Sequence, residues 1–207
     1  VFTMIPSAYA ADEEDDDLIG ANIQDGVLVG YYGPGGDIVI PNTVTAIAGE
    51  AFKGNKKITS VTIPGSVQEI GYSAFEGCPN LEKILFSNPK DGAQLTIRVS
   101  AFMDCPKLTE CTIPAVAKYV TGNVFKGCSS MTEIKVDPAN PYYFTQNGVM
   151  FGPWVEDGKP QYEDENLALI AYPCGNTATS YTIPSTVNGK TVNQIWASSF
   201  RKAANLT

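Results

Sequence analysis

Apolar residues recur along the chain at fixed offsets from a phenylalanine that follows a small or β-branched residue. The phenylalanines are Phe52, Phe75, Phe102, Phe125 and Phe200, with steps of 23, 27, 23 and 75 residues. An aliphatic residue stands five positions before each of them: Ile47, Ile70, Ile97, Val120 and Ile195. Six positions after the first Phe begins the run Ile58-x-x-Val61-x-Ile63, and similar runs follow the others. This spacing predicts a repeat of about 23 residues, lengthened in places by insertions.

Each run alternates apolar and polar residues, as in Val61-Thr62-Ile63, which is the pattern of a strand with one buried face. A unit of this length cannot enclose a core alone, so we expect the units to stack and to bury their apolar columns against each other. Pro64 ends its strand because proline lacks an amide donor. Gly54 and Gly77 permit tight turns. The sequence therefore predicts a mostly β solenoid, with short strands joined by irregular or short helical turns.

One unit shows the whole motif: Ile63-Pro64-x-x-Val67-x-x-Ile70-Gly71-x-x-Ala74-Phe75-x-Gly77-Cys78-x-x-Leu81-x-x-Ile84. This motif resembles the BspA-like class of bacterial leucine-rich repeats. The likeness covers residues 25–207, which we predict to form a leucine-rich-repeat solenoid. Departures, such as four added residues before Phe102, shift loops and leave the apolar columns in place. The resemblance implies a secreted or surface-attached protein, in a family associated with adhesion and with contact to host or neighbouring-cell molecules.

Residues 137–180 interrupt the repeat, and we predict an inserted β-hairpin there. The segment Asn147–Phe151 echoes Asp25–Val29, and Leu167–Pro173 reads as its antiparallel partner. The connection from Gly152 to Asn166 is rich in Gly, Pro and acidic residues, so we expect it to be exposed. The next repeat strand is expected at Tyr181. At the other end, Leu206 opens a new apolar column, so we expect an array truncated in mid-repeat and a natural chain that continues past Thr207.

The first residues differ in composition from the repeats. Residues 1–10 end in Ala8-Tyr9-Ala10, which suits signal peptidase, so we interpret them as a signal-peptide remnant. Residues 11–24 are predicted to be an acidic flexible segment, because Asp12–Asp17 are all acidic. Without those six residues the net charge of -8 falls to -2, from 16 acids against 14 bases. A body without a basic stripe argues against nucleic acid as a partner, and no apolar run is long enough to span a membrane.

The sequence contains no histidine, which removes Ser–His and Cys–His nucleophiles and imidazole metal ligands. It has no Gly-rich phosphate loop and no G-x-S-x-G elbow. We therefore predict no catalytic, cofactor-binding or metal-binding residues. The acids of the insertion fit no calcium loop and are interpreted as solvated charge rather than a glycosidase pair. They are Glu156, Asp157, Glu163, Asp164 and Glu165.

Five cysteines occur without a C-x-x-C pair: Cys78, Cys105, Cys111, Cys128 and Cys174. The first, second and fourth share one column of the repeat, and Cys111 stands in a strand column otherwise filled by Val and Ile. Buried thiols that act as small apolar side chains explain these positions. Disulfides between neighbouring coils remain the alternative, because adjacent strands lie ~4.8 Å apart.

The surface is left as the place where the protein acts. We predict a non-enzymatic binding or adhesion module, secreted or attached to the bacterial cell surface, that recognises an extracellular protein through the solenoid face and the hairpin. The alternatives are a structural spacer that displays a downstream module and a component of a carbohydrate-active enzyme. The candidate ligand-binding side chains are Thr62, Lys83, Thr112, Lys135, Tyr142, Tyr143 and Trp154.

Overall fold

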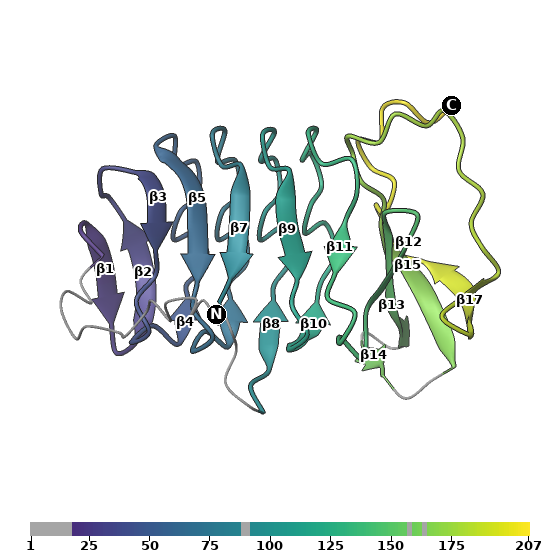
Figure 1. Cartoon of the computed structure of the whole chain (residues 1–207), viewed down its shortest axis with the longest axis horizontal. Coiled ribbons are helices and arrows are strands. Elements are labelled where there is room, and N and C mark those ends of the chain that lie inside the picture. Colours follow the sequence, from purple (N-terminus) through teal and green to yellow (C-terminus); the bar gives the residue numbers. More distant parts are fainter. Residues whose placement is uncertain (1–17, 88–91, 157–158, 163–164) are drawn as a thin grey trace, which may run out of the picture.

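The structure is a computed structural model that describes residues 18–87, 92–156, 159–162 and 165–207, without the side chains of residues 154–156 and 159. The predicted signal remnant and the run Asp12–Asp17 lie outside the described residues, as do Asp157, Glu163 and Asp164. The part that is described consists of strands and turns, and it includes no helix that is long and apolar enough to cross a membrane. The predicted solenoid is confirmed, with its repeats following one another in a single row (Figure 1).

Three sheets organise the described residues. The first sheet has the order β1 (Ala21–Gln24), β2 (Val27–Tyr31), β4 (Ala46–Ile47), β6 (Glu69–Ile70), β8 (Leu95–Ile97) and β10 (Ala117–Val120). The second sheet has the order β11 (Lys135–Val136), β9 (Glu110–Ile113), β7 (Lys83–Phe86), β5 (Ile58–Ile63) and β3 (Gly36–Val39). The third sheet has the order β12 (Phe144–Gln146), β13 (Val149–Glu156), β15 (Asn166–Ala171), β17 (Lys190–Ile195) and β16 (Thr186–Val187), and β14 (Lys159–Gln161) pairs with β13.

The predicted repeat strands form the second sheet. All of its pairs are parallel, and its register places Val61 opposite Ile84 and Ile84 opposite Cys111, so that each apolar column is continuous across the repeats. The segments expected to be irregular or short helical turns instead contain the two- to four-residue strands of the first sheet, joined by hydrogen-bonded turns. The sheet structure begins one strand before the predicted start of the solenoid at residue 25, because β1 already pairs with β2.

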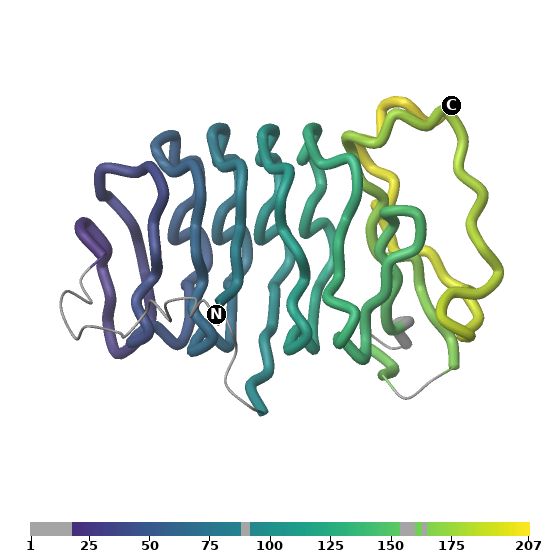
Figure 2. Tube along the Cα trace, viewed as in Figure 1, coloured from purple at the N-terminus to yellow at the C-terminus, as the bar shows by residue number. Residues whose placement is uncertain are grey.

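In each repeat, two residues with a left-handed backbone lie in the turns that lead to the next repeat, and these turns line up along the row (Figure 2). The first position is the third residue after the aliphatic one that precedes each Phe: Glu50 (φ 63°), Ser73 (φ 52°), Ser100 (φ 61°), Asn123 (φ 62°) and Ser198 (φ 70°). The second position is the second residue after each Phe: Gly54 (φ 67°), Gly77 (φ 71°), Asp104 (φ 56°), Gly127 (φ 81°) and Lys202 (φ 67°). Glycine suits the second position because it has no Cβ to clash in this conformation.

The phenylalanines form a row through the core, as the repeat predicted. The ring centroids of Phe52 and Phe75 lie 4.6 Å apart, those of Phe75 and Phe102 lie 5.6 Å apart, and those of Phe102 and Phe125 lie 5.7 Å apart. None of these four side chains is more than 3% exposed. Burying one such side chain stabilises a fold by roughly 1.5–3 kcal/mol, so this row is a main contributor to the cohesion of the stack.

The third sheet repeats the way in which the array begins. At the start of the array, the rings of Tyr31 and Phe52 lie 5.4 Å apart with an interplanar angle of 32°. In the last part of the chain, Tyr172 and Phe200 lie 5.3 Å apart with an interplanar angle of 33°. The backbone N–H of each tyrosine donates to the residue before the phenylalanine, 3.2 Å from Tyr31 to Ala51 O and 2.9 Å from Tyr172 to Ser199 O. Residues from β13 onward therefore start a second stack, and Met150, Ala168 and Ile170 join it to the core of the first.

The structure confirms one prediction about the insertion and corrects others. Strands β13 and β15 are antiparallel partners, as predicted. The expectation that the connection from Gly152 to Asn166 is exposed is wrong at its start. Gly152 is buried, and the ring of Tyr143 occupies the space that a side chain at this position would need. No strand forms at Tyr181, which packs against Tyr172 instead. Ile195 leaves its predicted column and is 51% exposed, because β17 pairs with β15 of the new stack rather than with β10.

All five cysteines are free and buried. Three of them donate the thiol hydrogen to the carbonyl of the Phe one repeat earlier: Cys78 to Phe52 at 3.0 Å, Cys105 to Phe75 at 3.0 Å and Cys128 to Phe102 at 3.1 Å. Burial raises the pKa of the Cys111 thiol and that of the Cys128 thiol, which keeps both in the neutral form. These thiols therefore belong to the core and its hydrogen bonds.

Candidate binding surfaces

The outer face of the second sheet, here called the strand face, carries two rows of side chains. One row follows the register from Asp37 through Ser60 and Lys83 to Glu110. The neighbouring row contains Val39, Thr62 and Leu85, and further along it Thr112 pairs with Lys135. The four predicted residues of this face therefore fall on both rows, with Lys83 on the first and the other three on the second. Thr62 is half-buried, and the other three are exposed.

The charged side chains in the first row of the strand face make polar contacts with their neighbours. Lys83 Nζ lies 3.5 Å from Glu110 Oε2, with both side chains about half exposed at 51%. The hydroxyl of Thr59 donates to Asp37 Oδ1 at 2.7 Å, and this hydrogen bond lowers the pKa of the Asp37 carboxyl. The half-exposed ion pair between Lys83 and Glu110 adds ~0–1 kcal/mol to stability. The ion pair and the Thr59–Asp37 hydrogen bond hold these polar groups in place beside the second row.

The second row of the strand face is less polar. Val39 is 66% exposed and Leu85 is 38% exposed. Beside Leu85, a hollow of about 250 Å³ opens between β7 and β9, and Phe86, Thr112 and Pro114 also line it. An apolar patch with a rim of paired charges is typical of a protein-binding surface.

The predicted aromatic residues of the insertion divide into different environments. Tyr142 is half-buried, and its ring meets that of Tyr162 edge-on with centroids 4.9 Å apart. The Nζ of Lys118 lies 5.8 Å from the centroid of the Tyr162 ring. Burial raises the pKa of Tyr162 to about 12, so that this phenol is neutral at ordinary pH. The side chain of Trp154 lies outside the described residues.

Tyr143 was predicted to be a surface residue, and this prediction is wrong. Its side chain is 1% exposed. Its hydroxyl accepts a hydrogen bond from the Val120 N–H at 2.8 Å and donates to the Val120 carbonyl at 3.4 Å. Since β10 is the last strand of the first sheet, the phenol takes the place that the next strand would have. Tyr143 therefore caps the array and is unavailable to a ligand.

Asn140 caps the array in a similar way and was missed in the sequence. It is 3% exposed, and its Nδ2 donates to the carbonyls of Pro114 at 2.8 Å and Ala117 at 3.0 Å. Its Oδ1 accepts from the N–H groups of Tyr142 at 2.8 Å and Tyr143 at 2.9 Å. One amide thus satisfies four backbone groups at the end of the stack. An Asn that follows the last repeat strand by four residues is the only sequence signal of this role.

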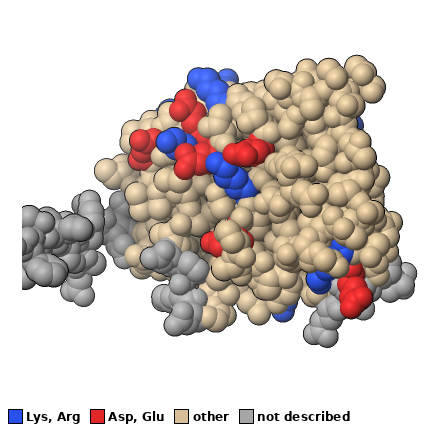
Figure 3. Space-filling view, turned by 45° about the vertical axis from the view of Figure 1, so that its right-hand side comes forward, with Lys and Arg blue, Asp and Glu red and all other residues tan. Residues whose placement is uncertain are grey.

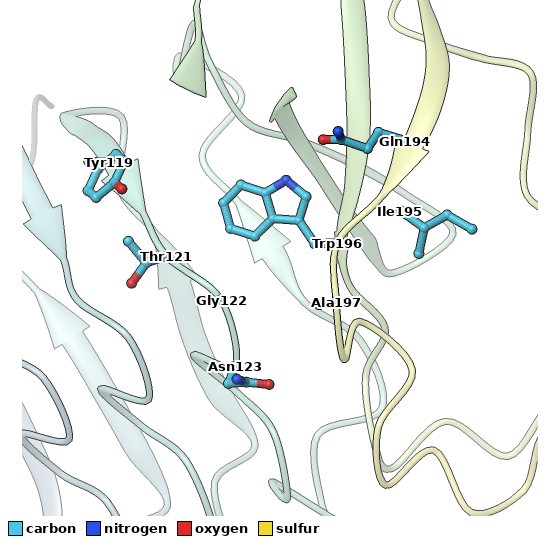
Figure 4. A pocket seen from close by; sticks show the side chains of 8 residues that line it. All are labelled: Tyr119, Thr121, Gly122, Asn123, Gln194, Ile195, Trp196 and Ala197. Carbon is cyan, nitrogen blue, oxygen red and sulfur yellow. The ribbon is translucent and has the colours of Figure 1, made fainter. Parts of the chain in front are cut away.

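A groove of about 540 Å³ lies between the end of β10 and the end of β17. Its lining includes Tyr119, Thr121, Gly122, Asn123, Gln194 and Trp196. Trp196 projects from the end of β17 toward Tyr119 and Thr121, whereas Ile195 points away (Figure 4). The other residues at the repeat position of Trp196 are Ala48, Gly71, Arg98 and Thr121. A Trp in this column was the signal in the sequence that could have located the groove.

Charged side chains of both signs lie together in small groups on the face shown in Figure 3, and large areas between them carry none. On the first sheet, Arg98 forms two hydrogen bonds with Glu69: Nε donates to Oε1 at 3.1 Å, and a terminal guanidinium nitrogen donates to Oε2 at 3.1 Å. Hydrogen bonding to Glu69 raises the pKa of Arg98. The described residues bring no three Cys, Asp or Glu side chains together in a group that could hold a metal ion.

Residues 34–147 match six copies of the BspA type leucine-rich repeat region, and this segment is more than half of the 207 residues. The chain belongs to the BspA-type leucine-rich repeat family. The matched residues run from just before β3 to the turn before β13, so they leave out β1 and β2 at one end and β13 to β17 at the other. None of the curated proteins matches the chain.

Two solved structures share the fold of these BspA-type repeats. The pneumococcal vaccine antigen PcpA superposes with a TM-score of 0.65 at 24% identity, over 86% of this chain and 44% of PcpA. A leucine-rich repeat protein from Eubacterium ventriosum superposes with a TM-score of 0.50 at 18% identity, over 86% of this chain and 53% of the other. The chain thus spans about half the length of the solved proteins that it matches.

Proposed function

We propose that this BspA-type chain is a non-enzymatic binding module outside the bacterial cell, which recognises an extracellular protein through the strand face. The observation that carries the proposal is the second row of that face, where Val39 is 66% exposed and Leu85 38% exposed beside a hollow of about 250 Å³. Exposed apolar side chains cost free energy in water, and covering them by a partner recovers it at ~25 cal/mol per Å². Thr62, Thr112 and Lys135 supply polar contacts on the same row.

The charged row gives the strand face its selectivity. Asp37, Lys83 and Glu110 follow one another with alternating sign, so a partner must place its own charges in the matching order. Wrong partners bring like charges together, which is unfavourable. Tyr142 and Trp154 of the insertion extend this proposal to the hairpin as a second contact region.

A location outside the cell fits the family and the first residues. Ala8-Tyr9-Ala10 has small residues at the positions that signal peptidase reads. PcpA, which shares the fold, is a vaccine antigen. Intact mass of the exported protein tests this part of the proposal: a mature chain that starts at Ala11 supports it, and one that retains residues 1–10 contradicts it.

The binding proposal is tested with a pair of matched variants. We expect the full chain to bind at least one member of a panel of immobilised extracellular-matrix proteins. Leu85→Asp places a charge in the strand face and should abolish that binding, while Val99→Asp makes the same kind of change at a residue that is 45% exposed on the turn after β8. Surface plasmon resonance measures both. Binding that survives Leu85→Asp contradicts the assignment to the strand face.

Two other outcomes favour the alternative functions. If no matrix protein binds and substitutions on the strand face have no effect, the chain acts as a structural spacer that displays another module. Hydrolysis of a glycan by the chain, with activity lost in Glu163→Gln, supports a component of a carbohydrate-active enzyme.

A further inference from the structure

The groove between β10 and β17 arises where the backbone ladder of the array breaks. In the first sheet, the residue after each buried aliphatic donates its N–H to the preceding repeat, as Thr121 does to Ile97 O at 3.0 Å. Trp196 holds the same place in its repeat, but its N–H donates to Leu169 O of β15 at 3.0 Å. The ladder therefore ends at β10 and begins again at β15. The groove of about 540 Å³ is the space left at this break.

The groove has a mainly apolar lining with a few polar groups, and none of the lining residues is acidic or basic. The polar groups are the amides of Asn123 and Gln194 and the hydroxyls of Tyr119 and Thr121, beside the indole of Trp196. Pockets of about 300–1,000 Å³ are the usual size for small ligands. With no ionic group to pair with a phosphate, carboxylate or ammonium, the lining selects a neutral ligand that is rich in hydrogen-bonding groups.

Two atoms in the walls of the groove lack a hydrogen-bond partner. Among the described residues, four buried side-chain polar atoms are unpaired, and Asn123 Oδ1 and Trp196 Nε1 are two of them. One is an acceptor and the other a donor, and a buried group of this kind is unfavourable while it is unpaired. A hydroxyl group can both donate and accept, so a ligand with several hydroxyls can satisfy both atoms once a small rotation of the amide and the indole exposes them.

The geometry disfavours an extended peptide in the same groove. A peptide would have to add to the free edge of β10 as a new strand. The phenol of Tyr143 already forms hydrogen bonds with the N–H and the carbonyl of Val120 on that edge, at 2.8 and 3.4 Å. A ring-shaped ligand has no such requirement. Its C–H groups can lie against the face of Trp196, which carries the negative part of the aromatic quadrupole.

We propose that the groove lined by Tyr119, Thr121, Asn123, Gln194 and Trp196 binds a neutral sugar. A pyranose ring presents C–H groups on its faces and hydroxyls around its edge, which matches an indole beside two amides and two hydroxyls. The site uses the first and third sheets only, so it is separate from the strand face. A sugar site in addition to a protein site would let one chain contact both components of a glycoprotein.

The sugar site is tested by NMR on the full chain. The chain has two tryptophans, Trp154 and Trp196, so its indole N–H groups give two signals, and the Trp154→Phe variant identifies that of Trp196. The probes are glucose, galactose, mannose, N-acetylglucosamine, maltose and lactose, with glucuronate as a charged counterpart of glucose. We expect at least one neutral sugar to shift the Trp196 signal in a saturable way, and glucuronate to leave it in place.

Variants decide whether the groove itself binds the sugar. Asn123→Gly removes the amide and suits the left-handed backbone at φ 62°. Tyr119→Phe removes one hydroxyl, and each variant should raise the Kd about tenfold, as expected for the loss of one hydrogen bond. Tyr72→Phe, at a residue that is 56% exposed outside the groove, should leave the Kd unchanged. The proposal is overturned if no neutral sugar shifts the Trp196 signal or if glucuronate shifts it as strongly. It is also overturned if the Asn123→Gly and Tyr119→Phe variants bind the sugar as the parent does.

Discussion

Lys202 Nζ lies 2.5 Å from Asp104 Oδ1, and this ion pair joins residues that are 98 positions apart in the chain. Both residues stand at the turn position where the other repeats have glycine, with φ 67° at Lys202 and φ 56° at Asp104. Gly127 lies between them, and a Cβ there would collide with the Asp104 carboxylate. The pair therefore links the last repeat of the second stack to the first stack over a residue that has to remain small.

The backbone at Lys202 leads to the first prediction. A left-handed conformation costs a non-glycine residue ~1–2 kcal/mol, whereas a half-exposed ion pair contributes ~0–1 kcal/mol. Lys202→Gly relieves the backbone strain and loses the ion pair, whereas Lys202→Ala loses the ion pair and keeps the strain. We expect the Gly variant to be about 1 kcal/mol more stable than the Ala variant in urea unfolding. At Lys126, which has no positive φ, the order should be reversed. The same order at both sites would contradict this interpretation.

The hydroxyl of Tyr143 should be necessary for the stability of the array end. Tyr143→Phe leaves the buried Val120 N–H without its partner, so we expect the free energy of unfolding to fall by ~1–3 kcal/mol. Tyr32→Phe makes the same change at a residue that is 80% exposed, and should stay within about 0.5 kcal/mol. Urea unfolding followed by circular dichroism measures both. Equal effects of the two substitutions would show that the cap at β10 does not form.

The same phenol should make stability depend on alkaline pH. Burial raises the pKa of Tyr143 above its ordinary value of 10.0. Above about pH 10 the unfolded chain ionises this phenol while the folded chain keeps its proton, so the free energy of unfolding falls as the pH rises. The contribution of this phenol to stability is complete below the pKa that it has in the unfolded chain and is lost as the pH rises above that value. We expect Tyr143→Phe to lose less stability than the parent between about pH 9 and pH 11. Equal losses would mean that the phenol is exposed to water.

Gly152 should resist substitution because of the same tyrosine. An ideal Cβ at Gly152 would lie 2.4 Å from Cδ1 of Tyr143, which is buried and cannot move aside freely. We expect Gly152→Ala to lower the free energy of unfolding by ~1–3 kcal/mol through overpacking. Gly122→Ala is the control, since the nearest atom to its Cβ is Cε3 of Trp196 at an ordinary 3.8 Å. Thermal unfolding of the two variants compares them, and a Gly152→Ala protein as stable as Gly122→Ala would contradict the packing described.

The stack could be predicted from the sequence because its signal is repeated. Each of the columns led by Phe52 and Ile47 is sampled several times, and alternation within Ile58–Ile63 identifies the buried face of a strand. A short strand such as β4 has only two residues, too few to show alternation, so the sequence predicts a turn there. Their pairing depends on the neighbouring repeat rather than on local preference.

The end of the array could not be predicted in the same way. Tyr143 and Asn140 occur once, and their function depends on which backbone groups β10 leaves unpaired. Ile195 fits its apolar column in sequence, yet it is 51% exposed because β17 joins a new stack. The two rows of the strand face followed from alternation, while the groove beside Trp196 depends on a break in the ladder. The repeat pattern therefore predicts the stacked units, whereas the residues at the end of the array and the groove could be identified only from the structure.

The stacked phenylalanines provide the most direct test of how the chain holds together. Phe75 lies in the middle of the row and is 0% exposed, whereas Tyr72, three residues earlier, is 56% exposed. Urea unfolding of Phe75→Ala should show a loss of ~3–5 kcal/mol, or a chain that no longer folds, while Tyr72→Ala should change stability by less than about 1 kcal/mol. If Phe75→Ala is as stable as Tyr72→Ala, the phenylalanine row does not form the core of the solenoid.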